Sequence, residues 1–100
     1  MKHTPGTWIA CEDDEREGMP FIPIETETDL VAQVEPDMDE ATQEFYISER
    51  TRANANLIAA APDLFEAVCQ AMRILESRPR ERSVYEVLWR AVKKAEGGVC

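Results

Sequence analysis

Apolar positions change their spacing about halfway along the chain. In residues 1–47 they form short runs separated by proline, glycine and acidic residues. From residue 48 onward they recur every three or four positions. The first pattern is typical of short strands and the second of amphipathic helices. We therefore expect an α+β fold, in which a small two- or three-stranded antiparallel sheet packs on two or three C-terminal helices.

Three segments of the N-terminal half carry strand patterns: 7–11, 21–25 and 30–35. Pro5 and Gly6, just before the first, suit a type II turn. The acidic stretch 12–18 is interpreted as a mobile loop. Pro23 lacks a backbone donor, which predicts an edge strand or a bulge for 21–25. Residues 37–47 are ambiguous, because Asp39 could cap a short helix while 45–47 could equally be extended.

Capping residues divide the C-terminal half into three predicted helices. Ser48 is a good N-cap for a helix over 49–61, and Pro62 should end it because the residue before a proline avoids the helical region. Asp63 should then cap a second helix, which breaks at 77–79. Ser83 and Glu86 form a capping box for a third helix that runs to about residue 95 and ends at Gly97 and Gly98.

The length of 100 residues fits one domain. We expect a single domain over 1–100, with a strand-rich acidic half (1–47), a helical half (48–95) and a flexible tail (96–100). No apolar run approaches the ~20 residues of a membrane helix, and no signal peptide is visible, so we expect a location in the cytoplasm. The three cysteines, Cys11, Cys69 and Cys100, lack zinc-site spacing; Cys69 should be buried and Cys100 exposed.

Charge is distributed unevenly around the net value of −9. Residues 1–49 carry 14 acidic and two basic side chains (net −12), whereas 50–100 carry six acidic and nine basic ones (net +3). One interpretation is a solvated surface that keeps the protein dispersed. The other is an acidic face for a basic partner, formed by Glu12, Asp13, Asp14, Glu15, Glu17, Glu35, Asp37, Asp39 and Glu40.

The sequence gives no pattern for catalysis or for a cofactor. His3 is the only histidine, and no nucleophile elbow, phosphate-binding loop or dinucleotide fingerprint is present. The carboxylates are numerous, but their spacing does not select a catalytic pair. We therefore expect a non-enzymatic protein without cofactor or metal.

A basic surface in the C-terminal half is the alternative candidate site. Its members are Arg78, Arg80, Arg82, Arg90, Lys93 and Lys94. Tyr85 and Trp89 lie nearby in sequence and could stack on bases, although Trp89 adjoins the apolar stripe and is expected in the core. Trp8 is expected to plug one end of the small core.

Two segments resemble a family of small phage and prophage proteins. They are the motif of residues 3–8, His-Thr-Pro-Gly-Thr-Trp, and residues 53–64, Ala-Asn-Ala-Asn-Leu-Ile-Ala-Ala-Ala-Pro-Asp-Leu. Thr7 replaces the usual second proline of this family, and Asn56 replaces its usual arginine. The alanines and Pro62 also have a structural interpretation as a tight helix–helix corner.

The resemblance implies a phage accessory protein, and such proteins often disable host defences by binding them. The sequence hypothesis is thus an anti-CRISPR type of inhibitor in the host cytoplasm, whose acidic surface meets a basic nucleic-acid-binding surface of a CRISPR–Cas complex. Two alternatives remain open: a non-inhibitory interaction or regulatory module, which could act as a homodimer, and a nucleic-acid binder that uses the C-terminal arginines.

Overall fold

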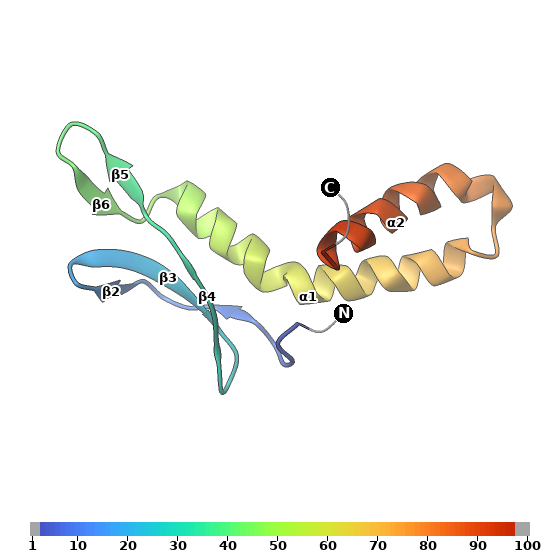
Figure 1. Ribbon diagram of the computed structural model, residues 1–100, viewed down its shortest axis with the longest axis horizontal. Helices are drawn as coiled ribbons and strands as arrows, with labels where there is room; N and C mark the ends of the chain where they lie inside the picture. Colours follow the sequence, from blue (N-terminus) through green and yellow to red (C-terminus); the bar gives the residue numbers. More distant parts are fainter. Residues whose placement is uncertain (1–2, 98–100) are drawn as a thin grey trace. The chain divides into compact units, whose positions relative to one another are not determined.

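The computed structural model describes residues 3–97, which form six strands followed by two α-helices (Figure 1). The expected α+β fold, with an antiparallel sheet before the helices, is confirmed. The expectations for Gly98, Cys100 and the end of the tail lie outside the described residues. Within them, no helix is both long and apolar enough to cross a bilayer.

The long strand β3 (Met19–Glu25) is the centre of the main sheet. Along one side it pairs antiparallel with β1 (Ile9–Ala10) and β2 (Asp14–Arg16), and along the other with β4 (Leu30–Val34). The sheet thus has four strands in the described part of the chain, one more than the largest number expected.

The acidic stretch 12–18 contains a strand, so its interpretation as a loop was wrong. Arg16 pairs with Met19, which leaves Glu17 and Gly18 as a two-residue hairpin connection between β2 and β3. Both have positive φ, 54° and 81°, as a type I′ turn requires. Such turns match the twist of the flanking strands, so glycine at position 18 fixes the register of this hairpin.

Pro23 lies in the central strand, so the edge position expected for it was wrong. The bulge alternative fits, because four residue steps separate Ala10 from Asp14 while three separate their partners Ile24 and Phe21. The carbonyl of Pro23 accepts a hydrogen bond from the Cys11 amide (2.9 Å) at this irregularity. Since β1 and β2 are interrupted here, the missing proline donor disturbs no regular ladder.

A second hairpin resolves the ambiguity of residues 37–47 in favour of strands. Its strands β5 (Asp37–Asp39) and β6 (Glu44–Tyr46) pair antiparallel. The Asp39 carboxylate accepts a hydrogen bond from the Ala41 amide (2.9 Å), and Gln43 adopts a positive φ of 60°. Asp39 therefore stabilises a turn rather than a helix start.

The core lies between the sheet and the beginning of helix α1 (Glu49–Leu75). Ile22 and Ile24 are completely buried and pack with Val34 and Ala55. The small side chain of Ala55 lets the helix approach the sheet closely. Trp8 packs against this cluster and donates its indole N–H to the Thr4 carbonyl (2.9 Å), which agrees with its predicted role as a plug.

Helix α1 begins as predicted and continues further than predicted. The Ser48 hydroxyl caps it by accepting the Thr51 amide hydrogen bond (3.0 Å). Pro62 lies inside the helix, so the predicted end at residue 61 and the cap by Asp63 were wrong. The preceding residue is an alanine in a run of three; alanine is the best helix former, and its short side chain limits crowding against the proline ring.

The final helix, α2 (Arg82–Ala95), follows the 3₁₀ turn η1 (Pro79–Glu81). Because this turn leads directly into Arg82, Ser83 is already helical, and the predicted capping box does not form. Glu81 occupies the N-cap position without a side-chain bond. Gly97 ends the helix as expected, with a φ of 86° and an amide that donates to the Lys94 carbonyl (3.1 Å).

The chain divides into two compact units within α1. The sheet unit spans Lys2–Ala61, and the helical hairpin unit begins at Pro62. The sheet unit carries 14 acidic and four basic residues (net −10), while residues 62–100 carry six and seven (net +1). The acidity of the protein therefore belongs to the sheet unit.

Candidate functional site

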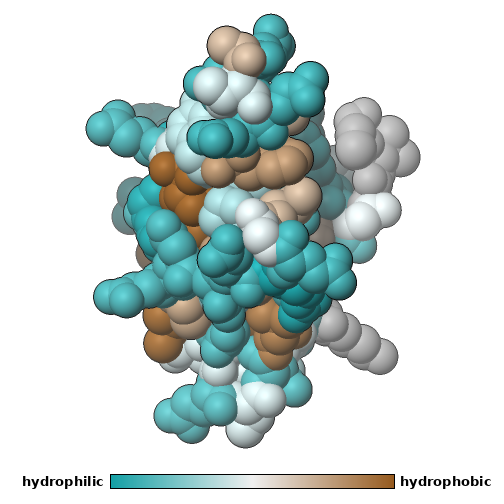
Figure 2. All heavy atoms as spheres, turned by 90° about the vertical axis from the view of Figure 1, so that its left-hand side faces the viewer, coloured by the Kyte–Doolittle hydropathy of each residue, from teal (hydrophilic) through white to brown (hydrophobic). Residues whose placement is uncertain are grey.

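The nine candidate acids lie at two places in the sheet unit. The group over 12–17 lies before β2, on it and in the β2–β3 turn, and the group over 35–40 runs from the end of β4 to the β5–β6 turn. In Figure 1 the tips of both hairpins lie at the same end of this unit. Figure 2 views the molecule from that end and shows a mainly hydrophilic surface with separate hydrophobic patches.

Two of the aspartates are paired with arginines of α1. The Arg52 guanidinium donates to the Asp13 carboxylate and, through its other nitrogen, to the Cys11 carbonyl (2.8 Å). The Arg50 guanidinium lies 2.5 Å from the Asp37 carboxylate, which also accepts the Ser48 hydroxyl bond. These contacts hold the β1–β2 connection and strand β5 against the first turn of α1.

The Asp37 pair also affects protonation. The hydrogen bond from Arg50, and then that from Ser48, holds the pKa of the Asp37 carboxyl below its ordinary value of 3.8. The same pairing raises the pKa of Arg50. Asp37 therefore stays ionised but is already neutralised by a cation of its own chain.

The other two aspartates of the set stabilise local backbone. The Asp14 carboxylate accepts the Glu15 amide hydrogen bond (2.8 Å), and Asp39 accepts that of Ala41 (2.9 Å). Short carboxylate side chains reach nearby amides easily, which explains why aspartate performs this role. All four aspartates of the candidate surface are thus engaged within the molecule.

The five glutamates of the set behave differently. All are exposed, and among the described residues none makes a side-chain hydrogen bond or ion pair: Glu12, Glu15, Glu17, Glu35 and Glu40. Their carboxylates are open to solvent and form no ion pair within the described part of the chain. The structure therefore narrows the candidate surface from nine acids to these five, which we call the free glutamates.

Two free glutamates, one from each group, meet at a shallow cavity on the sheet face opposite the core. The cavity, of about 210 Å³, is lined by Arg16, Glu17, Met19, Phe21, Gln33 and Glu35. Pairing of Arg16 with Met19 and of Gln33 with Pro23 places these side chains on one face. The Arg16 guanidinium lies 5.7 Å from the centre of the Phe21 ring and covers it.

The alternative basic residues are only partly brought together. Arg78, Arg82 and Arg90 line two shallow cavities of about 350 and 370 Å³ that share Tyr85 and Trp89. Arg80 and Lys94 line neither, whereas Lys93 lies 5.6 Å from the Trp89 ring. Trp89 is 47% exposed, so its expected place in a core was wrong.

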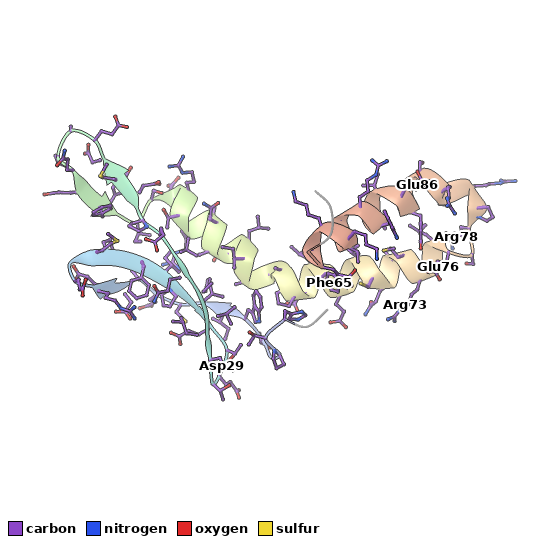
Figure 3. All side chains as sticks on the ribbon, viewed as in Figure 1. Asp29, Phe65, Arg73, Glu76, Arg78 and Glu86 are labelled. Carbon is purple, nitrogen blue, oxygen red and sulfur yellow. The ribbon has the colours of Figure 1, made fainter. Side chains whose placement is uncertain are left out.

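Two of these six basic side chains are paired with neighbouring acids. Arg82 pairs with Glu86 (3.4 Å), and Lys93 lies 4.0 Å from Glu96. In Figure 3 Glu86 points outward from α2, and Glu76 lies near Arg78 at the end of α1. Two of the six positive charges of this surface are therefore compensated within the described residues.

The N-terminal motif has a structural role. The His3 ring meets Trp8 edge-on, with centroids 5.8 Å apart, and Gly6 has a φ of 98°, as the second central residue of a type II turn requires. Among the described residues, no group of three or more histidine, cysteine or acidic side chains could hold a metal ion. Cys11 and Cys69 are half-buried free thiols, so the burial expected for Cys69 is only partial.

The division between aspartates and glutamates was not recognised from the sequence, although one signal was available. Aspartate is favoured where it can bond to nearby backbone, and Asp39 directly precedes a turn. The pairing of Asp13 and Asp37 with arginines of α1 depends on contacts across 39 and 13 residues, which no local pattern reveals.

Comparison with known proteins identifies a phage family. Residues 1–99 match the family described as Salmonella phage P22 protein Y8K6. Among curated proteins and among solved structures, no match was found. The phage character implied by the sequence resemblance is thus supported over nearly the whole chain, which belongs to the Salmonella phage P22 protein Y8K6 family.

Proposed function

We propose that this phage protein is a counter-defence protein of the anti-CRISPR type, which binds and inhibits a nucleoprotein complex in the host cytoplasm. It acts by binding rather than by catalysis. The free glutamates contact a basic surface of the partner that otherwise holds nucleic acid. The observation that carries the proposal is the set of five exposed, unpaired glutamates on a unit with a net charge of −10.

The charges of the free glutamates act over the distances at which the protein and its partner first approach each other. The screening length at physiological salt is about 8 Å, so neighbouring carboxylates on hairpins add their potentials. A basic channel that normally holds nucleic-acid phosphates is complementary to such a surface, and the same carboxylates repel DNA and RNA. Complementary charge accelerates association by about tenfold or more at low salt.

The hairpins position these charges at little entropic cost. The type I′ turn fixes Glu17, and the Asp13–Arg52 and Asp37–Arg50 pairs fix the flanking segments to α1. A binding surface that is already ordered loses less conformational entropy in a complex. The aspartates therefore serve as supports and the glutamates as the contact groups of the proposed interface.

The test is binding to purified CRISPR–Cas effector complexes of a host, with their binding to target DNA as a second readout. Glu17→Lys/Glu35→Lys should slow association by roughly tenfold at low salt and should restore DNA binding by the effector. The matched control, Glu66→Lys/Glu81→Lys, changes the net charge equally but on the helical unit, and should leave binding intact. Equal affinities for both double variants and the wild type would remove the electrostatic proposal.

A second candidate, binding of single-stranded nucleic acid, is favoured by one observation. The exposed Trp89 lies with Tyr85, Arg82 and Arg90 around a common cavity, and aromatic faces with arginines suit stacked bases. The decisive experiment is an oligonucleotide titration at low salt, with Trp89→Ala as the variant. Binding that is lost in the variant supports this candidate, whereas no binding by the wild type removes it.

A further inference from the structure

The helical hairpin unit contains no residue that is fully buried. Over 62–97 every side chain is exposed or half-buried, although α2 has a strongly amphipathic sequence. The seam between the helices consists of half-buried residues such as Leu75 and Leu88. Two helices of this length bury too little apolar surface to be stable without further packing. The exposed apolar side chains of this unit therefore require a further packing partner.

The cavity beside Trp89 shows which side of the hairpin remains apolar. Glu76 and Trp89 line the same cavity, so they lie on one face of the hairpin. In a helix, successive residues are about 100° apart, so the two neighbours of a seam residue lie on opposite flanks. Ile74 and Glu76 flank Leu75, and Val87 and Trp89 flank Leu88. Ile74 and Val87 consequently share the opposite face.

This opposite face is apolar along both helices and is called the hairpin face below. On α1 it contains residues at spacings of three and four: Leu64, Ala67, Ala71 and Ile74. On α2 the corresponding residues are Val84, Val87, Ala91 and Ala95. The four larger side chains are all exposed: Leu64 50%, Ile74 58%, Val84 47% and Val87 63%. Such spacing, with alanines between larger residues, is typical of helix–helix packing in bundles.

The charges at the edges of the hairpin face are complementary to one another. Asp63 precedes Leu64 at the outer edge of α1, and Lys94 continues the row of Val87, seven residues later, at the outer edge of α2. Because α2 runs back along α1, both residues lie at the same end of the hairpin (Figure 1). Among the described residues neither makes a side-chain ion pair.

We propose that a second copy of this chain covers the hairpin face. The twofold axis runs parallel to the helices, so each α1 packs on the α2 of the other copy in a four-helix arrangement. Rotation about this axis does not change a residue's position along the helices. Since Asp63 and Lys94 lie at the same end of the hairpin, Asp63 faces Lys94 of the partner subunit. The near-neutral charge of residues 62–100 (net +1) permits two copies to associate, whereas two sheet units at −10 repel each other.

The test is sedimentation velocity of the full chain in reducing buffer over a wide range of concentrations. We expect a monomer–dimer equilibrium. Val87→Glu places a carboxylate in the hairpin face and should raise the dimer dissociation constant at least about thirtyfold. Since Val87 is 63% exposed in the single chain, circular dichroism should show unchanged helix content. Lys93→Gln, with the same charge change on the opposite side, is the control and should leave the dimer intact.

The arrangement is tested separately by exchanging charges. Asp63→Lys should weaken the dimer, and the double variant Asp63→Lys/Lys94→Asp should restore it. A wild-type monomer at every concentration would overturn the proposal, and so would a dimer that persists undiminished in Val87→Glu. Failure of the double variant to restore association would overturn the pairing of α1 with the partner's α2.

Discussion

Replacing Pro62 by alanine should stabilise the protein, because α1 continues through this position. In a helix interior proline is about 3 kcal/mol less favourable than alanine, since it lacks an N–H and clashes with the carbonyl four residues earlier, that of Ile58. Proline also restricts the unfolded chain, and its removal therefore costs roughly 0.4–1 kcal/mol of stability, which is subtracted from this gain. The expected net gain is about 2 kcal/mol, equivalent to a rise of roughly 10 °C in the melting temperature of a chain this size.

Thermal unfolding followed by far-ultraviolet circular dichroism measures this gain, and two variants make the result specific. Pro79→Ala changes a proline at the start of η1, where no amide donor is needed, and should have little effect. At concentrations low enough for the chain to be monomeric, Asp63→Ala should be close to neutral inside a continuous helix. If the chain instead broke at residue 62 with Asp63 as the cap, Asp63→Ala would cost about 1 kcal/mol. Destabilisation by both Pro62→Ala and Asp63→Ala would refute the continuous helix.

Three further outcomes are expected from the sheet unit. Arg50 lowers the pKa of Asp37, so their pairing stabilises the fold at neutral pH and ceases to do so as acid protonates Asp37. Arg50→Ala should therefore raise the pKa of Asp37 in a carboxyl NMR titration. The stability lost by the Arg50→Ala variant should shrink below pH 3.8. Gly18 has a φ of 81° and no atom within 4 Å of an added Cβ, so Gly18→Val should cost about 1–2 kcal/mol in urea unfolding through backbone strain alone, with a smaller loss for asparagine. Ile24→Ala should cost about 2–5 kcal/mol in the same assay because Ile24 is completely buried, whereas Ile9→Ala, at a 56% exposed position, should cost much less.

The parts of the fold that were predictable from sequence depend on local chemistry. Ser48 caps its helix, and Gly6 and Gly97 adopt positive φ, because each of these features is decided within a few residues. The strands around Ile22 and Val34 also follow from local apolar patterns. In these segments the local preference and the tertiary packing favour the same structure.

Predictions failed where the surrounding sequence or the neighbouring element, rather than the single residue, decided the outcome. Pro62 was expected to end a helix, but the alanines before it and the apolar spacing after it support continuation. Ser83 was expected to cap, but the turn at Pro79 starts the helix two residues earlier, with Glu81 at the N-cap position. Pro23 is tolerated in the central strand because the strands beside it are interrupted there. In none of these three cases does the identity of the single residue decide the local structure.

The candidate surface shows the same distinction at the level of single side chains. From the sequence, Asp13 and Glu12 are equivalent negative charges, yet Asp13 is bonded to Arg52 across 39 residues while Glu12 projects into solvent. Reversing Asp13 would break an internal pair and perturb the local structure that Arg52 holds, so a loss of binding in that variant would not by itself identify the interface. Reversing Glu17 and Glu35 removes no internal bond. Only the glutamate variants, therefore, can distinguish an acidic surface that binds a partner from one that merely keeps the protein dispersed.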